Sequence, residues 1–301
     1  MTKNNSLHVM CYSGGVESAV AVIELVRRYG NDNVVLLNHD ISPDAEDQDI
    51  KQYKQDIADY LGLPITPCNA VSKSYSSLDP ILGAIERNNF KSPMGHLCCH
   101  YLNTEPFNLW LDPIIRAMET KAFKVGCGSE LCTARLKTEP FDKWLSDRSD
   151  KSDISDMTVY YGFAPEEQHR VSRRQMILGK RGIKSDYPLL WADRTIHDTA
   201  EIGIPAPAHY KIWKHGNCIG CLKAGWQHWY CVYVHRRDRW ELSKIAEGII
   251  GYAINKRGGV PCRLIEREAE FEELRQAGLP ATEHIPAGKF WSTARKLLKN
   301  T

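Results

Sequence analysis

The chain has 301 residues, of which 39 are basic and 37 acidic, giving a formal net charge of +2 at pH 7. This length can bury a substantial core. Because basic and acidic residues nearly balance, the net charge neither requires nor excludes a nucleic-acid partner. Only a local basic surface could bind one. The longest apolar stretch, near residues 18–26, contains Glu24 and is too short to span a bilayer. The first six residues lack the apolar segment of a signal peptide, so we expect a cytoplasmic protein with no membrane partner.

The first seventy residues alternate between strand and helix patterns. Short apolar runs predict strands at Leu7–Tyr12, Asn33–Asn38 and Leu63–Val71. Apolar residues at helical spacing predict helices over Glu17–Tyr29 and Asp44–Leu61. This alternation predicts an α/β fold with a doubly wound parallel sheet and crossover helices.

The chain from about residue 72 to 155 is irregular and rich in Cys, Pro and charge. Residues 97–111 recur with many identities as residues 131–145, and each copy predicts a Cys-bearing loop followed by a helix near Glu-Pro-Phe. Local duplication and a paired site both explain this repeat. We predict a nucleotide-binding domain over 1–205 with a Cys-rich insertion at about 72–155, followed by a small Cys/Trp-rich and helical C-terminal module over 206–301.

Strand and helix patterns return after the insertion. Met157–Gly162 predicts a further strand, and Glu166–Gly182 a basic helix. A strand-like turn at Tyr187–Trp191 and a helix at Ile196–Ile202 follow. The charged tail, Phe271–Thr301, is expected to be helical.

A Gly-Gly loop separates the first predicted strand from the first predicted helix. It reads Ser13-Gly14-Gly15-Val16-Glu17-Ser18. The glycines can take positive φ and let backbone N–H groups approach an anion, while the helix dipole and the Ser hydroxyls favour negative charge. An ordinary Gly-Gly turn is the alternative. The loop is neither a Walker A loop nor a Rossmann fingerprint, but its place at a strand end and a helix start favours phosphate binding.

This loop resembles the Ser-Gly-Gly-x-Asp-Ser loop of the PP-loop ATP pyrophosphatase superfamily, in particular its phosphoadenylyl-sulfate (PAPS) reductase-like branch. Glu17 stands where that loop has Asp, which keeps the carboxylate but lengthens its reach. Four further stretches resemble the same branch: Asn38-His39-Asp40, Cys132-Thr133-x-x-Leu136-Lys137-x-x-Pro140, Tyr161-Gly162-Phe163 with Glu167-x-His169-Arg170, and Asn217-Cys218-Ile219-Gly220-Cys221-Leu222-Lys223. The resemblance runs from Leu7 to about Trp240 and does not extend to the last sixty residues.

The resemblance implies an adenine nucleotide α-hydrolase-like fold that binds ATP or PAPS together with Mg²⁺. Ser13–Ser18 would hold phosphates, Asn38, His39 and Asp40 would lie near adenosine, and Gly162 would contact the nucleotide. We expect Glu17, Lys137 and Arg170 to be the catalytic residues. The two basic residues are suited to phosphates of substrate or nucleic acid.

Ten cysteines are many for a chain expected in a reducing compartment. Cys218 and Cys221 form a C-x-x-C turn, and Cys127 and Cys132 in the earlier loop supply two further ligands. Four thiolates suit an iron–sulfur cluster or Zn²⁺ equally, and free thiols remain the alternative. Cys98, Cys99 and Cys231 are reserve ligands, whereas Cys11, Cys68 and Cys262 have the apolar neighbours of core residues.

Three functions follow from these features. The favoured one is ATP-dependent adenylation coupled to sulfur transfer, with tRNA or DNA as the nucleic-acid acceptor and a sulfur-donor protein as partner. The second is reduction of a sulfonucleotide, for which the resembling reductases use a nucleophilic Cys near the carboxyl terminus. The last cysteine here is Cys262, 39 residues from the end, which weighs against reduction. The third is a non-catalytic nucleotide-binding or sensing module.

Overall fold

The computed structural model describes residues 6–68, 112–122, 137–148, 156–216 and 218–299. The chain divides into two compact units. Unit 1 comprises the described residues of 1–40, 48–70 and 139–208, and unit 2 those of 41–47, 71–138 and 209–301. No helix within the described ranges is both long enough and apolar enough to cross a membrane.

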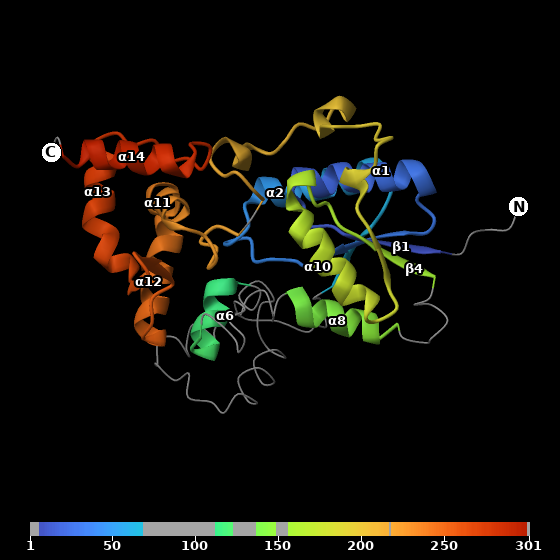
Figure 1. Ribbon diagram of the computed structural model, residues 1–301, viewed down its shortest axis with the longest axis horizontal. Coiled ribbons are helices and arrows are strands. Elements are labelled where there is room, and N and C mark those ends of the chain that lie inside the picture. The colour runs from blue at the N-terminus through green and yellow to red at the C-terminus, as the bar shows by residue number, and fades with distance from the viewer. Residues whose placement is uncertain (1–5, 69–111, 123–136, 149–155, 217, 300–301) are drawn as a thin grey trace, which may run out of the picture. The chain divides into compact units, whose positions relative to one another are not determined.

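Unit 1 is built on a five-stranded sheet in which every neighbouring pair is parallel. The strands are β1 (Leu7–Cys11), β2 (Val34–Asn38), β3 (Ile65–Pro67), β4 (Met157–Tyr160) and β5 (Lys184–Asp186), in the order β3-β2-β1-β4-β5. Figure 1 labels the neighbouring strands β1 and β4. In the central register Met10 of β1 lies beside Leu36 of β2 and Tyr160 of β4. The predicted α/β class with a parallel sheet is thereby confirmed, and the strand order is compatible with a doubly wound fold.

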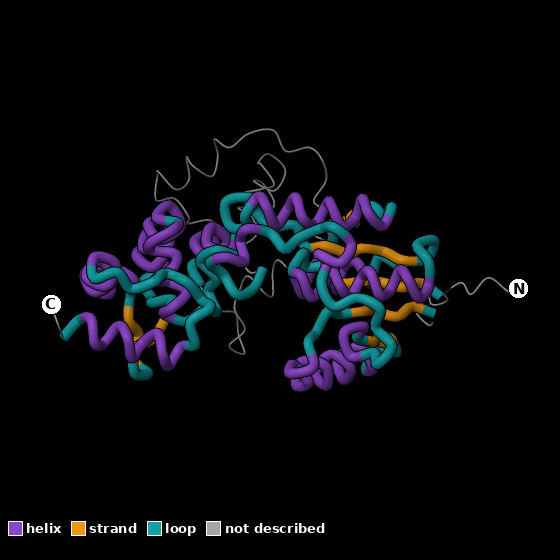
Figure 2. The backbone as a smooth tube through the Cα atoms, turned by 90° about the horizontal axis from the view of Figure 1, so that it is seen from above, coloured by secondary structure: helices purple, strands orange, loops and turns teal. Residues whose placement is uncertain are grey.

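Helices cover both faces of this sheet (Figures 1 and 2). The helices are α1 (Val16–Tyr29), α2 (Gln48–Leu61), α8 (Glu139–Ser146) and α10 (Gln168–Gly179). Met10 and Tyr12 pack with α1 and α2, whereas Val9 packs with α8 and α10. Successive strand residues face opposite sides, which places these neighbouring residues in two separate cores.

Two predicted elements of unit 1 differ from the structure. Tyr187–Trp191 is not strand-like, because Pro188 begins a 3-10 turn, η5 (Pro188–Leu190), and lacks the N–H that a ladder needs. The fifth strand is instead β5, a polar edge strand of three residues that carries no apolar signal. The predicted helix from Asp44 begins only at Gln48.

Unit 2 is mainly helical. Its helices are α6 (Pro113–Thr120), α11 (Trp226–His235), α12 (Arg237–Ile250), α13 (Glu268–Gln276) and α14 (Ala287–Leu297), and β6 (Asn255–Arg257) pairs antiparallel with β7 (Val260–Cys262). Trp229, Trp240 and Phe271 are fully buried in its core. The predicted helical tail is confirmed by α13 and α14. The burial of Trp229 and Trp240 makes them packing residues.

Short 3-10 helices connect the larger elements. Besides η5 they are η4 (Pro165–Glu167), η6 (Thr199–Ile202), η7 (Ala208–Lys211) and η8 (Leu264–Arg267). The predicted helix at Ile196–Ile202 is therefore shorter than expected and is η6. Glu24 of α1 is buried and accepts hydrogen bonds from the N–H groups of Thr195 and Ile196, which fixes the chain ahead of η6 against α1.

Candidate functional site

The Gly-Gly loop lies at the point where the strand order of unit 1 reverses. The chain runs from β1 to β2 and β3 on one side and then crosses to β4 and β5 on the other side of β1. In open parallel sheets, ligands bind beyond the carboxyl ends of the strands at this switch point. The loop after β1 and the loop after β4 therefore border the expected binding position in unit 1.

The Gly-Gly loop is held by the hydroxyl group of Ser18. Ser18 Oγ accepts hydrogen bonds from the Gly14 N–H (3.1 Å) and the Ser13 hydroxyl (3.2 Å), and donates to the Gly15 carbonyl (2.8 Å). Gly14 has φ +84°, a conformation that favours glycine. Gly15 is the N-cap residue of α1 and provides no side-chain cap. The loop is thus preformed, with the positive end of a 14-residue helix behind it.

Gly162 brings the loop after β4 directly against the start of α1. A Cβ on Gly162 would lie 2.8 Å from Ser18 Cα and 2.9 Å from the Glu17 carbonyl oxygen. Both are backbone atoms, so only glycine permits this approach. Gly162 and Ser13–Ser18, which were predicted from distant parts of the sequence to contact one nucleotide, therefore meet in the structure.

Asn38 and Asp40 follow the carboxyl end of β2. Asn38 is buried, and its side-chain amide donates to the Tyr12 carbonyl at 2.6 Å. Asn38 therefore joins the ends of β1 and β2, whatever contact it makes with a ligand. The Asp40 carboxylate pairs with Lys51 Nζ at 2.6 Å. His39 lies between them, half-buried.

The three predicted catalytic residues occupy different places. Glu17 is exposed in the first turn of α1, at the Gly-Gly loop. Arg170 of α10 pairs with Glu167 and lies 4.2 Å from the ring centroid of Phe163, in the loop that follows β4. Glu17 and Arg170 thus both belong to unit 1 and adjoin the two loops at the switch point. Lys137 belongs to unit 2, where its charge acts on Cys218.

Lys54 is a residue at this loop that the sequence interpretation missed. It is buried in α2, and its aliphatic chain occupies the space beside Gly14. The sequence does carry a signal, because Lys54 interrupts the otherwise uncharged stripe of α2 that faces the core. Lysines on amphipathic helices usually keep the ammonium group in water at the edge of such a stripe, so the residue pattern alone does not identify Lys54 as buried.

Cys218 and Cys221 lie in a tight turn of unit 2 that His228 holds. Gly220 has φ +76°, and the N–H groups of Gly220 and Cys221 both donate to His228 Nε2 at 3.2 Å. His228 Nδ1 in turn donates to Glu283 Oε1 at 2.6 Å. The imidazole of His228, from α11, therefore orders the backbone between the two cysteines. The structure supports a tight C-x-x-C turn, as expected.

The surroundings of the Cys218 thiol act in opposing directions on its pKa. Burial raises the pKa of Cys218 to about 11, the charge of Lys137 opposes this rise, and the nearby Cys221, Glu46 and Asp112 add to it. A thiolate at this position needs a compensating cation, which a bound metal supplies. The other predicted ligands, Cys127 and Cys132, lie outside the described residues, as do the reserve ligands Cys98 and Cys99.

The remaining described cysteines are packed in the two units. Cys231 is fully buried in α11, and Cys262 is buried at the end of β7. Cys11 and Cys68 pack against the sheet face that α8 and α10 cover, and burial raises the pKa of each to about 12. Neutral thiols in apolar surroundings behave as small hydrophobic residues, which is the role expected for Cys11, Cys68 and Cys262.

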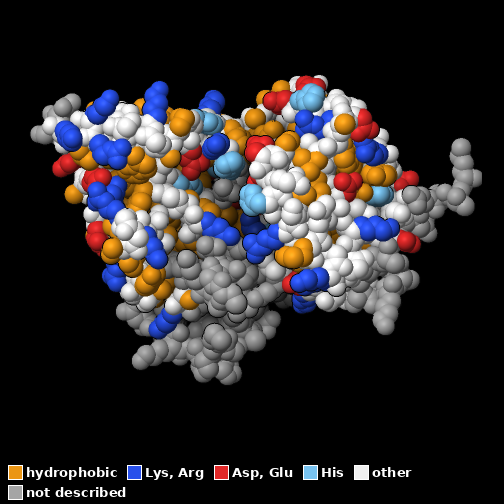
Figure 3. All heavy atoms as spheres, viewed as in Figure 1, with side chains coloured by type: hydrophobic (Ala, Val, Ile, Leu, Met, Phe, Trp, Pro, Cys, Tyr) orange, Lys and Arg blue, Asp and Glu red, His pale blue; other side chains and the backbone are white. Residues whose placement is uncertain are grey.

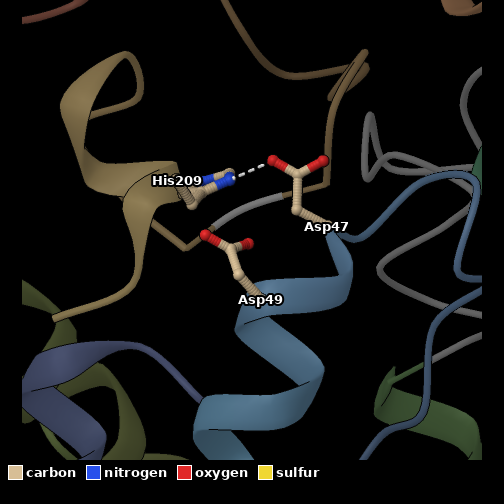
Figure 4. A group of neighbouring side chains, drawn as sticks. All are labelled: Asp47, Asp49 and His209. Carbon is tan, nitrogen blue, oxygen red and sulfur yellow. Dashed lines mark hydrogen bonds and ion pairs between the residues drawn. The ribbon is translucent and has the colours of Figure 1, made fainter. Parts of the chain in front are cut away.

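Unit 2 contains a further polar pair, formed by Asp47 and His209 (Figure 4). His209 is buried; its Nδ1 lies 2.7 Å from Asp47 Oδ2 and its Nε2 lies 3.0 Å from the His215 carbonyl. Arg236 contacts the other Asp47 oxygen at 3.2 Å. Carboxylate and imidazole are also common ligands of divalent metals. In this structure, however, both ring nitrogens of His209 hydrogen-bond to oxygen atoms, and the pair ties residues 41–47 to η7.

The chain matches no known protein family, and no curated protein and no solved structure is found to be similar to it. Fold and site therefore define the chain only as an α/β protein with a parallel sheet and a candidate anion-binding loop at its switch point. Any finer assignment depends on the residues themselves.

Proposed function

We propose that unit 1 binds the phosphates of an adenine nucleotide at Ser13–Ser18. The observation that carries this proposal is the meeting of the Gly-Gly loop with Gly162 at the switch point of the sheet. Positive φ at Gly14, an N-cap without a side chain and a helix dipole all favour a bound anion. The close approach of Gly162 holds the loop after β4 beside the Gly-Gly loop, so that both loops can border one ligand.

We further propose that the chain is a PP-loop-type enzyme that uses ATP to adenylate an acceptor oxygen and couples this step to sulfur transfer. Attack of the acceptor on the α-phosphate would release pyrophosphate, and a sulfur nucleophile would then displace AMP. The Gly-Gly loop would hold the departing pyrophosphate. Arg170, fixed over Phe163, would place positive charge near the phosphates. Glu17 offers a carboxylate for Mg²⁺, which would supply charge neutralisation of the polyphosphate.

Nucleotide binding is tested by titration calorimetry of the full chain with ATP, a non-hydrolysable ATP analogue, PAPS and adenosine. Gly14→Ala should abolish binding of the nucleotides, because a side chain there is strained at positive φ and overlaps Lys54. Gly179→Ala is the matched control, since nothing lies within 4 Å of the added methyl group. Circular dichroism confirms that each variant is folded. Wild-type protein that binds none of the nucleotides, or a folded Gly14→Ala variant with wild-type affinity, refutes the site.

The chemistry is tested by the products. Incubation with labelled ATP, a sulfur donor and either tRNA or DNA should yield AMP, pyrophosphate and a sulfur-bearing nucleic acid. Release of sulfite from PAPS with thioredoxin would instead establish the sulfonucleotide reductase. Tight binding of nucleotide without turnover would establish the sensing module.

Figure 3 shows Lys and Arg side chains interspersed with acidic and apolar ones on the face drawn. The nucleic-acid acceptor therefore rests on the basic residues near the site and on the resemblance.

We also propose that Cys218 and Cys221 ligate a metal centre, either an iron–sulfur cluster or Zn²⁺, with Cys127 and Cys132 as the expected additional ligands. Support comes from the tight turn that carries both thiols and that His228 orders through two hydrogen bonds. Anaerobic purification followed by a visible spectrum and by iron, sulfide and zinc assays measures the content. Cys218→Ser and Cys221→Ser should lose metal, whereas Cys262→Ser, at a thiol of the same unit, should retain it. Equal metal content in all three variants contradicts the assignment.

A further inference from the structure

Lys54 lies in the middle of α2, on the side of that helix that faces the core of unit 1. The buried residues of α2 are Ile50, Tyr53, Lys54, Ile57, Ala58 and Leu61. Lys54 is the charged member of this stripe and is only 4% exposed. Burying an ammonium group is costly unless its hydrogen bonds and charge are compensated. Lys54 therefore brings a buried positive charge into unit 1.

The backbone of Lys54 is anchored at the end of β1. The hydroxyl group of Tyr12 donates to the Lys54 carbonyl at 3.3 Å. Tyr12 directly follows β1 and directly precedes the Gly-Gly loop, and its own carbonyl is held by Asn38. The neighbouring Tyr53 is buried, and its hydroxyl lies 2.9 Å from that of Thr199. Lys54 thus projects from a fixed position beside the loop.

The side chain of Lys54 crosses Gly14. A Cβ built on Gly14 would overlap Cγ, Cδ and Cε of Lys54, and the overlap is most severe at Cε. Cε carries the ammonium group, so the positive charge lies at the loop rather than at the far end of the helix. Gly14 is therefore favoured by its φ of +84°, and a Cβ at this position would also displace the side chain of Lys54.

The Gly-Gly loop has no basic residue of its own. Ser13–Ser18 contains no Lys or Arg and carries the carboxylate of Glu17. The dipole of α1 supplies about half a positive charge, which is less than a phosphate dianion demands. A lysine ammonium has three N–H donors, so it can serve a partner in the protein and a phosphate oxygen together. Nucleotide-binding loops with their own lysine solve the same problem within the loop.

We propose that Lys54 is a phosphate-binding residue, which donates to and neutralises the phosphate group held by Ser13–Ser18. This inference rests on the proposed nucleotide site and identifies the phosphate group as the part of the ligand that Lys54 recognises. Lys54 recognises the polyphosphate, so inorganic pyrophosphate and ATP bind through it, whereas adenosine does not. In the competing explanation Lys54 only fills space beside Gly14 and stiffens the loop.

Three variants separate the two explanations. Lys54→Met keeps an unbranched side chain of similar length and removes the charge, Lys54→Arg keeps the charge, and Lys54→Gln is a second uncharged variant should the first not fold. Lys184→Met is the control, because Lys184 is exposed and starts β5, at the amino end of the strand. Each full-length variant is titrated calorimetrically with ATP, pyrophosphate and adenosine at several salt concentrations.

Loss of a charge-assisted hydrogen bond should weaken binding of ATP and pyrophosphate by about tenfold to a hundredfold in Lys54→Met. Lys54→Arg should recover part of the affinity, and the salt dependence should be shallower in Lys54→Met than in wild type. Binding of adenosine should not change, and Lys184→Met should behave as wild type. Equal weakening for adenosine and pyrophosphate, or wild-type affinity in folded uncharged variants, overturns the role of Lys54 while leaving the nucleotide site intact. Wild-type protein that binds neither ATP nor pyrophosphate overturns both.

Discussion

Replacing Gly162 by Ala perturbs the closest approach in unit 1 with a single methyl group. That methyl would lie 2.8 Å from Ser18 Cα and 2.9 Å from the Glu17 carbonyl oxygen, whereas ordinary contacts begin near 3.4 Å. The atoms that it meets are backbone atoms at the start of a helix, so no side-chain rotation relieves the overlap. Either the start of α1 or the end of β4 must move by about half an ångström, and such overpacking costs about 1–3 kcal/mol.

Urea denaturation followed by circular dichroism measures this cost. Gly179→Ala is the matched control, because it adds the same methyl group at the last residue of α10 with nothing within 4 Å. The control should be neutral or more stable by about 0.4–1 kcal/mol, since alanine reduces the entropy of the unfolded chain. Gly162→Ala should unfold at a lower urea concentration with an unchanged slope. Equal midpoints for Gly162→Ala and wild type would show that the two loops are not in contact.

Two further predictions concern unit 2. Arg239 of α12 forms a buried ion pair with Asp112 through two hydrogen bonds, and Asp112 also caps α6. Arg239→Met should lower the free energy of unfolding, measured with urea, by about 3–5 kcal/mol, because it leaves a buried carboxylate without its counter-charge. Adding Asp112→Asn should restore part of that loss, since Asn still caps a helix, and a double variant no more stable than the single one contradicts this account. Burial raises the pKa of Glu247 above its ordinary 4.5, against the N–H groups of Ile254 and Leu264 that lower it. The folded chain then holds this proton more tightly than the unfolded chain, so stability should fall as pH rises from about 4.5 through the folded pKa. In Glu247→Gln the urea midpoint should change less with pH over this range. Parallel curves of midpoint against pH for the variant and the wild type would refute the raised pKa of Glu247.

The local patterns of the sequence were sufficient for four of the five strands of the sheet and for the Gly-Gly loop. β1, β2 and β4 are apolar runs, and the Gly-Gly loop follows the first of them directly. Sequence neighbours decide these features, which is why the residue pattern identifies them. β5 was missed because a polar edge strand owes its position to its partner β4 rather than to its own residues.

The residues that complete the candidate sites depend on contacts between distant segments. Lys54 is buried only because α2 packs over the end of β1, and the same spacing on a free helix would leave its ammonium in water. His228 and Glu283 are 55 residues apart and form the hydrogen bond that orders the cysteine turn. Pattern analysis identified Cys218 and Cys221 from their spacing, but nothing in that spacing points to an imidazole in the helix that follows.

Gly14, Gly162 and Lys54 together explain why a phosphate site would form at this edge of the sheet. Gly14 turns the chain and leaves room for Lys54, while Gly162 lets β4 bring its loop against the start of α1. Of these three residues, Gly14 and Gly162 determine the shape of the site because they lack side chains. Lys54 supplies the positive charge that contributes to affinity. A methyl group at Gly162 should therefore alter stability and binding of ATP together, whereas loss of charge at Lys54 should alter binding of ATP and pyrophosphate with little effect on folding. This separation between the two variants follows from the contacts of unit 1 and does not depend on the acceptor of the proposed reaction.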